Sequence, residues 1–105
     1  MLAHADEVAL PVIVLGEYRY GISQSRNSAR YENWLAGLIT DCIILDINEE
    51  STHHYAAINL ELRRIGKPIP TNDLWIAALG RQHGMPIVSR DRHFDLVPGL
   101  RRLHW

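Results

Sequence analysis

The stretch "PIPTNDLWIAALG", Pro68–Gly80, places one carboxylate, Asp73, directly before a continuous apolar run. Thr71 or Asn72 can begin a helix after the prolines, so Asp73 falls in the first turn of that helix. There the helix dipole stabilises an ionised carboxylate by about 0.3–1 kcal/mol, which is a common and purely structural role. The residues that follow are apolar on nearly every side. They predict a buried helix whose opening carboxylate needs polar partners.

The composition is that of an ordinary globular domain. The chain has 105 residues, of which 47% are hydrophobic and 22% are charged, and its formal net charge is −1 at pH 7. We therefore expect one domain spanning residues 1–105 and no overall basic field, although a local basic patch can still bind nucleic acid. The single cysteine, Cys42, cannot form an internal disulfide and is expected to be buried, in a reducing compartment.

The sequence predicts neither a membrane span nor a signal peptide. Its apolar runs are shorter than the roughly 20 residues that cross a bilayer. The first residues, "MLAHADEV", lack a basic region followed by an apolar run. We therefore expect a cytoplasmic protein without a membrane partner.

Helical patterns alternate with short buried strands along the chain. Strands are expected up to Pro11, at "CIILDI" (42–47, covered on both faces), at "PIVS" (86–89) and at "LRRLHW" (100–105, an edge strand). Helices are expected after Pro11, over 28–40 with Ser28 as the cap, from Asn48 to about Ile65 with a stop at Gly66, and from Thr71 or Asn72 to Gly84. Residues expected in core-facing stripes are Tyr31, Trp34, Leu35, Leu38, Tyr55, Ile58, Leu62, Ile65 and Trp75. This alternation predicts a three-layer α/β domain with a mainly parallel sheet.

Two further carboxylates stand at the edges of apolar segments. Asp91, in "IVSRDRHF", follows a short strand, and Glu17 is the only charge in "VIVLGE". Taken singly, Asp91 is also typical of a turn residue that bonds its own backbone, and Glu17 of a partly exposed surface residue. In open α/β sheets, however, ligands bind at the carboxyl ends of strands and the adjoining helix starts. We therefore expect Glu17, Asp73 and Asp91 to converge at one end of one sheet.

Three segments resemble the PIN-domain ribonucleases, in particular the VapC-type toxins of toxin–antitoxin pairs. They are "LPVIVLGEYRYGISQS" (10–25), "GKPIPTNDLWIAAL" (66–79) and "IVSRDRHFDLVPGLRRLHW" (87–105), and the likeness runs from about residue 7 to residue 105. The resemblance implies a three-layer PIN-like fold in which Glu17 lies on a helix following a strand. It also implies hydrolysis of RNA phosphodiesters, a cognate VapB-like antitoxin and a homodimer.

The resemblance assigns roles residue by residue. Glu17, Asp73 and Asp91 match acidic positions that surround Mg²⁺ or Mn²⁺ in the family, and hard divalent cations prefer such carboxylate oxygens. A bound metal can lower the pKa of water and neutralise charge in phosphoryl transfer. Thr71 and Asn72 match polar positions able to hydrogen-bond a carboxylate or a metal-bound water, and Asp95 is a weaker acidic candidate. Apart from the resemblance, His93 is a candidate because it neighbours Asp91 and could touch phosphate, with a structural role as its ordinary alternative.

The sequence departs from the family at its start. The family begins with a central strand that ends in an aspartate, whereas "MLAHADEVALP" resembles the family's second strand and the helix before it. Asp6 cannot replace that aspartate, because it lies before the second strand and not at the end of the first. The first strand and one of four acids are therefore expected to be missing, either through a misplaced start codon or in a naturally shortened protein. The alternative function is a catalytically inactive remnant that binds the antitoxin.

Several roles stay open for the basic residues and the histidines. Arg90 and Arg92 bracket Asp91, and Arg19 lies close to Glu17, so these arginines are candidates for RNA contact, with solvated surface as their ordinary role. The six histidines show no zinc-ligand spacing. A phospho-receiver would share the acidic pocket, but it needs a lysine opposite its aspartate, and the single lysine lies in a proline-flanked loop.

Overall fold

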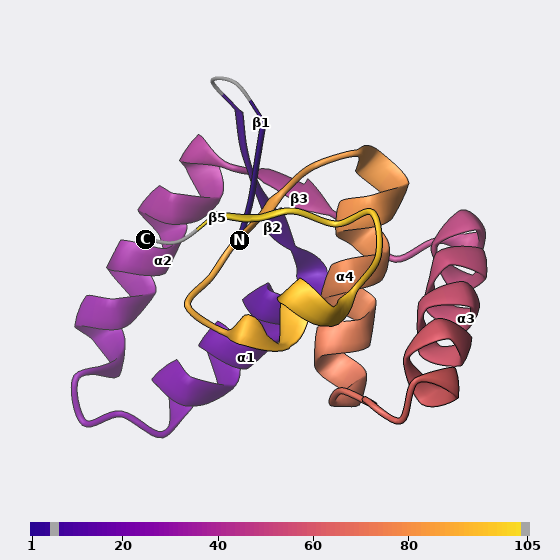
Figure 1. Ribbon diagram of the computed structural model, residues 1–105. Helices are drawn as coiled ribbons and strands as arrows, with labels where there is room; N and C mark the ends of the chain where they lie inside the picture. The colour runs from indigo at the N-terminus through magenta and orange to yellow at the C-terminus, as the bar shows by residue number, and fades with distance from the viewer. Residues whose placement is uncertain (5–6, 104–105) are drawn as a thin grey trace.

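The computed structural model describes residues 1–4 and 7–103 of the chain (Figure 1). Its strands are β1 (Leu2–His4), β2 (Glu7–Pro11), β3 (Ile43–Leu45), β4 (Ile87–Val88) and β5 (Arg102–Leu103). Its α-helices are α1 (Val12–Ser23), α2 (Ser28–Asp41), α3 (Glu49–Arg64) and α4 (Thr71–His83), and a 3-10 helix, η1, spans Arg92–Leu96. The expected alternation of short strands and helices is confirmed after Pro11. Before it, residues 2–4 form strand β1 where the resemblance implied a helix, so that expectation was wrong.

The five strands form one mixed sheet in the order β3-β2-β1-β4-β5. β2 pairs with β3 in parallel, as β4 does with β5, whereas β1 runs antiparallel to both β2 and β4. Four strands therefore share one direction and β1 alone opposes them, so the sheet is mainly parallel, as expected. Leu2 on β1 lies beside Ala9 on one side and Ile87 on the other. The expectation that a further family strand is missing stays a prediction.

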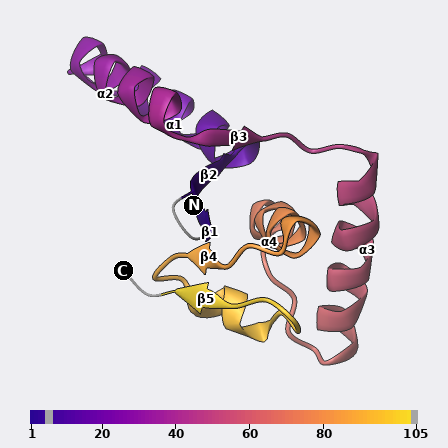
Figure 2. The same ribbon diagram turned by 90° about the horizontal axis from the view of Figure 1, so that it is seen from above.

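Helices lie on both sides of this sheet (Figures 1 and 2). α2 lies on one side, toward β3, while α4 and then α3 lie on the other. The core cluster lies between the sheet and the helices α4 and α3. It includes Leu2, Ile58, Leu62, Ala77 and Ile87, all fully buried. The central part of α4 is buried as predicted, so the apolar run after Asp73 packs between α3 and the sheet.

Local signals set several helix ends correctly. Asn48 caps α3 in a capping box, because its side chain accepts the Ser51 N–H while the Ser51 hydroxyl accepts the Asn48 N–H. Gly84 ends α4 in the left-handed conformation, with a φ of 63°, which favours glycine. The expected cap at Ser28 was wrong, because the N-cap of α2 is Asn27, whose side chain makes no capping hydrogen bond.

Some residues expected in the core lie at its margin. Trp34 is 53% exposed, Ile65 is 58% exposed, and Tyr31 is also exposed. The apolar faces of α2 and α3 therefore extend beyond the part that other elements cover. Ile43 is exposed because β3 is an edge strand, so the expected cover on both faces of "CIILDI" was wrong. Cys42 is only half-buried. Across the described residues, none of the helices has the length and apolar character that crossing a bilayer requires.

Candidate metal centre

Three acidic residues lie on segments that follow strands or begin a helix. Glu17 lies on α1, which begins directly after β2, and Asp91 lies in the turn that follows β4. Asp73 lies in the first turn of α4, after the extended backbone of Pro70. Because β2 and β4 run in the same direction, their carboxyl ends lie at the same edge of the sheet.

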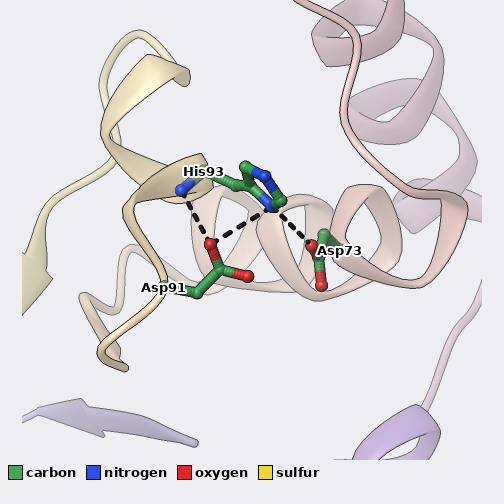
Figure 3. A group of neighbouring side chains, drawn as sticks. All are labelled: Asp73, Asp91 and His93. Carbon is green, nitrogen blue, oxygen red and sulfur yellow. Dashed lines mark hydrogen bonds and ion pairs between the residues drawn. The ribbon is translucent and has the colours of Figure 1, made fainter.

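Asp73, Asp91 and His93 form a compact cluster (Figure 3). The Nδ1 atom of His93 lies 3.3 Å from Oδ2 of Asp73 and 3.2 Å from Oδ1 of Asp91. One potential ligand atom from each of the three residues lies within 4.8 Å of the others. The Asp73 side chain is the most enclosed, at 20% exposed, against 41% for Asp91 and 51% for His93. The cluster is therefore open to solvent on its Asp91 and His93 side.

The Asp91 carboxylate is held by the turn in which it lies. Its own backbone N–H donates to the Ser89 hydroxyl at 3.0 Å, and its Oδ1 accepts the His93 backbone N–H at 2.9 Å. Asp91 therefore also acts as a turn residue that accepts a hydrogen bond from the nearby backbone, as its sequence position allowed. That bond also aims the carboxylate at the His93 imidazole, so the turn and the cluster depend on each other.

Glu17 adjoins the cluster without joining it. Asn72 donates a hydrogen bond from Nδ2 to Oε1 of Glu17 at 3.2 Å, which ties α1 to the first turn of α4 beside Asp73. Among the described residues, the group of close ligand atoms contains Asp73, Asp91 and His93, and Glu17 stands outside it. Thr71, the first residue of α4, is exposed.

Asp95 is held by a different partner. Arg102 on β5 binds both of its carboxylate oxygens, at 2.8 and 3.0 Å, and also donates to the Ser89 carbonyl at 3.0 Å. These hydrogen bonds from Arg102 hold the pKa of the Asp95 carboxyl below its usual value. The structure therefore does not bring Asp95 into the cluster. Sequence reasoning missed Arg102, because nothing in the spacing of residues 95 and 102 indicates that β5 lies along η1.

The basic candidates lie on the surface. Arg19, Arg90 and Arg92 are all exposed, the first on α1 and the other two on either side of Asp91. Arg92 also lies close enough to Asp95 to contribute to lowering its pKa.

The donor set suits a divalent cation. Two carboxylates supply the negative charge and the hard oxygen atoms that Mg²⁺ and Mn²⁺ prefer. The open side of the cluster leaves room for the waters that such ions retain, because Asp91 and His93 are each about half exposed. An imidazole is a less usual ligand for Mg²⁺ than a third carboxylate. Its presence extends the range of ions that suit the cluster to transition metals.

Comparison with known proteins fits this arrangement. Residues 1–100 match the family model described as "PIN domain". The chain belongs to the PIN-domain family. Ribonuclease VapC2 of Haemophilus influenzae is 35% identical over 107 residues, covering 97% of this chain and 78% of the relative. Ribonuclease VapC5 of Mycobacterium tuberculosis is 28% identical over 96 residues, covering 90% and 71% respectively.

Solved structures agree with this PIN-domain assignment. VapBC2 from Rickettsia felis, bound to a DNA fragment from its promoter, has a TM-score of 0.88 at 28% identity, covering 94% of this chain and 75% of that one. DNA-bound VapBC from Salmonella typhimurium has a TM-score of 0.86 at 30% identity, covering 92% and 74% respectively. The resemblance to VapC-type PIN ribonucleases noted from the sequence motifs is confirmed. The part of the chain that matches the PIN domain contains Glu17, Asp73, Asp91 and His93.

Proposed function

We propose that this PIN domain is a divalent-cation-dependent endoribonuclease toxin held in check by a cognate antitoxin. The observation that carries the proposal is the convergence of Asp73 and Asp91 on one point at the carboxyl edge of the sheet. Two carboxylates held this close repel each other, and a bound cation offsets that repulsion. The relatives support the substrate class and the partner, since they are named ribonucleases and the solved neighbours are VapBC complexes.

In this proposal Asp73 and Asp91 hold Mg²⁺ or Mn²⁺, with Glu17 completing the acidic set from α1. A bound divalent cation supplies water activation and charge neutralisation for phosphodiester hydrolysis. Asn72 fixes the Glu17 carboxylate beside the cluster. The surface arginines Arg19 and Arg92 attract the RNA backbone to a site that would otherwise repel it, since phosphate binding depends on such cations.

The test is RNA cleavage by the full chain in MgCl₂ or MnCl₂. Asp73→Asn keeps the size of the side chain and removes its charge, so we expect cleavage to fall by about 100-fold or more, since even the loss of an outer-shell metal partner costs up to that much. Asp41→Asn, an exposed carboxylate at the end of α2, is the matched control and should cleave like the wild type. Equal cleavage by wild type and Asp73→Asn would reject the catalytic assignment.

A second candidate function is binding of the antitoxin by a catalytically inactive chain. The observation that favours it is the aromatic surface of the α1–α2 pair, where an open hollow of about 270 Å³ is lined by Tyr18, Ile22, Tyr31 and Trp34, among others. Trp34 and Tyr31 are exposed although both are large aromatics. Exposed aromatic patches of this kind mark protein interfaces.

The two candidates are separated by measuring cleavage and capture together. An inactive antitoxin-binding chain shows no cleavage in either metal and still captures its purified cognate antitoxin. Trp34→Ala should then weaken capture by about tenfold or more, as a buried interface tryptophan does. Leu60→Ala, a 51% exposed residue on α3, is the control that should leave capture unchanged. A chain that neither cleaves RNA nor captures the antitoxin contradicts both candidates.

A further inference from the structure

His93 directs one ring nitrogen at two carboxylates. Its Nδ1 atom lies 3.3 Å from the Asp73 oxygen and 3.2 Å from the Asp91 oxygen (Figure 3). A single N–H on that nitrogen can point well at only one of the two acceptors. The spacing is close to the roughly 3.0 Å that separates neighbouring ligand atoms placed about 2.1 Å from an octahedral cation. The nitrogen is thus spaced from each oxygen as neighbouring ligands of one ion are, and all three atoms lie within 4.8 Å of one another.

The fold fixes the backbone that carries this imidazole. His93 lies in η1, and the next residue, Phe94, is buried in the core with 3% exposure. The backbone N–H of His93 holds the Asp91 carboxylate at 2.9 Å, so imidazole and carboxylate are positioned by the same turn. Asp73 comes from α4, which contacts η1 directly. The turn and the contact between η1 and α4 therefore place His93 next to both carboxylates.

We propose that His93 is a direct metal ligand that biases this site toward first-row transition ions such as Mn²⁺ and away from Mg²⁺. The proposal rests on the proposed function, because it concerns the ion that Asp73 and Asp91 hold. Its chemical basis is ligand softness. Carboxylate and water suit Mg²⁺ and Mn²⁺ alike, whereas imidazole suits Fe, Ni, Cu and Zn best, Mn²⁺ less well and Mg²⁺ least.

The experiment measures metal binding without any RNA. Mn²⁺ and Mg²⁺ affinities of the full chain are determined by calorimetry, with each metal alone and in competition. His93→Asp replaces nitrogen by carboxylate oxygen, and His93→Gln removes the imidazole while keeping a polar side chain. We expect the Mn²⁺-to-Mg²⁺ affinity ratio to fall by about tenfold or more in both, the range seen when metal-site partners are removed. His83→Gln, at the exposed end of α4, is the control and should keep the wild-type ratio.

A spectroscopic readout distinguishes a direct ligand from a nearby hydrogen-bonding group. Pulsed electron paramagnetic resonance of the Mn²⁺-loaded chain should show nitrogen coupling in the wild type and in His83→Gln, and none in His93→Asp. Mn²⁺ binding that depends on Asp73 but shows no nitrogen coupling and an unchanged affinity ratio overturns the role of His93 alone. A wild-type chain that binds neither metal overturns this inference together with the proposed function.

Discussion

Asp91 and Asp95 lie four residues apart, yet their side chains have different hydrogen-bond partners and different roles. Asp91 accepts the His93 backbone N–H and faces the cluster, whereas both oxygens of Asp95 are taken by Arg102. Arg102 also bonds the Ser89 carbonyl, just before the turn that carries Asp91. Asp95 therefore secures β5 to η1, and its charge is already matched by a guanidinium. Nearness in sequence to Asp91 therefore does not bring Asp95 into the proposed metal centre.

The ion pair between Asp95 and Arg102 predicts an acid-dependent part of the stability. Because the hydrogen bonds from Arg102 lower the pKa of Asp95 in the folded state, this pair stabilises the fold at pH above the ordinary carboxyl value of 3.8, and that contribution is lost as pH falls through the folded pKa. In urea unfolding at pH 7 and pH 3, Asp95→Asn should lose less stability on acidification than the wild type. Arg102→Gln should behave in the same way as Asp95→Asn. Identical pH dependence in all three proteins would contradict this role.

The sequence could identify the cluster residues better than their partners. Asp73 and Asp91 were predictable because each follows a recognisable strand or begins a recognisable helix at the carboxyl edge of the sheet. The contact of His93 with Asp73 was not predictable, because it depends on how η1 turns over the start of α4. Glu17 was expected among the converging acids, and the structure instead joins it to Asn72. Long-range side-chain pairing leaves no periodic signal in a sequence.

At the scale of elements, α4 is the helix that supports the site. It packs along α3, and its first turn supplies Asp73 while its later turns lie against β4 and the segment before β5. At Gly80, α4 lies very close to the residues that follow it in the chain. A Cβ atom placed there would lie 2.9 Å from the Leu100 side chain and 3.2 Å from the Met85 carbonyl oxygen. Gly80 is therefore a packing residue within a buried helix.

Two glycine substitutions distinguish the effect of packing on stability from the effect of helix propensity. Gly80→Ala should destabilise the protein by about 1–3 kcal/mol, because the methyl group overpacks a filled site and meets a backbone oxygen. Gly37→Ala, in the middle of α2 with open space around its Cβ position, should stabilise it by about 0.5–1 kcal/mol through propensity alone. Chemical denaturation of both variants checks the pair. A stabilising Gly80→Ala would show that α4 sits farther from Leu100 than described.

Element boundaries were predictable where local chemistry sets them. The Asn48 cap, the stop after Gly84 and the buried run of α4 all follow from short-range backbone rules. The exposure of Trp34 and Ile43 was not predictable, because it depends on which strand forms the sheet edge and on which helix surfaces meet another element. Periodicity marks an apolar face but does not say whether a neighbour covers it.

At the scale of the whole molecule, β1 joins the two halves of the sheet. It pairs with β2 over three residues and with β4 through Leu2, so the pair β3-β2 is connected to β4-β5 by this one short strand. The Met1 carbonyl adds a bond by accepting the Val88 N–H at 2.8 Å. The relative position of α1 and the turn after β4, and hence the spacing of the acidic residues, depends on that connection.

A leucine near the chain terminus should therefore behave as a core residue. Leu2→Ala is expected to destabilise the protein by about 2–5 kcal/mol, since Leu2 is fully buried between Ala9 and Ile87. Leu60→Ala, at a half-exposed position on α3, should change stability by less than about 0.5 kcal/mol. Thermal or urea unfolding compares the two. Equal, small effects would indicate that β1 does not hold the centre of the sheet in solution.

The proposed metal centre requires Asp73, Asp91 and His93 to gather around one divalent ion at the carboxyl edge of the sheet. Crystals of the chain prepared in MnCl₂ test this most directly, through an anomalous difference map measured to locate manganese. We predict a peak bounded by the two carboxylates and the imidazole. A well-ordered site without a peak, or with the Asp73 and Asp91 side chains turned away from each other, would contradict it.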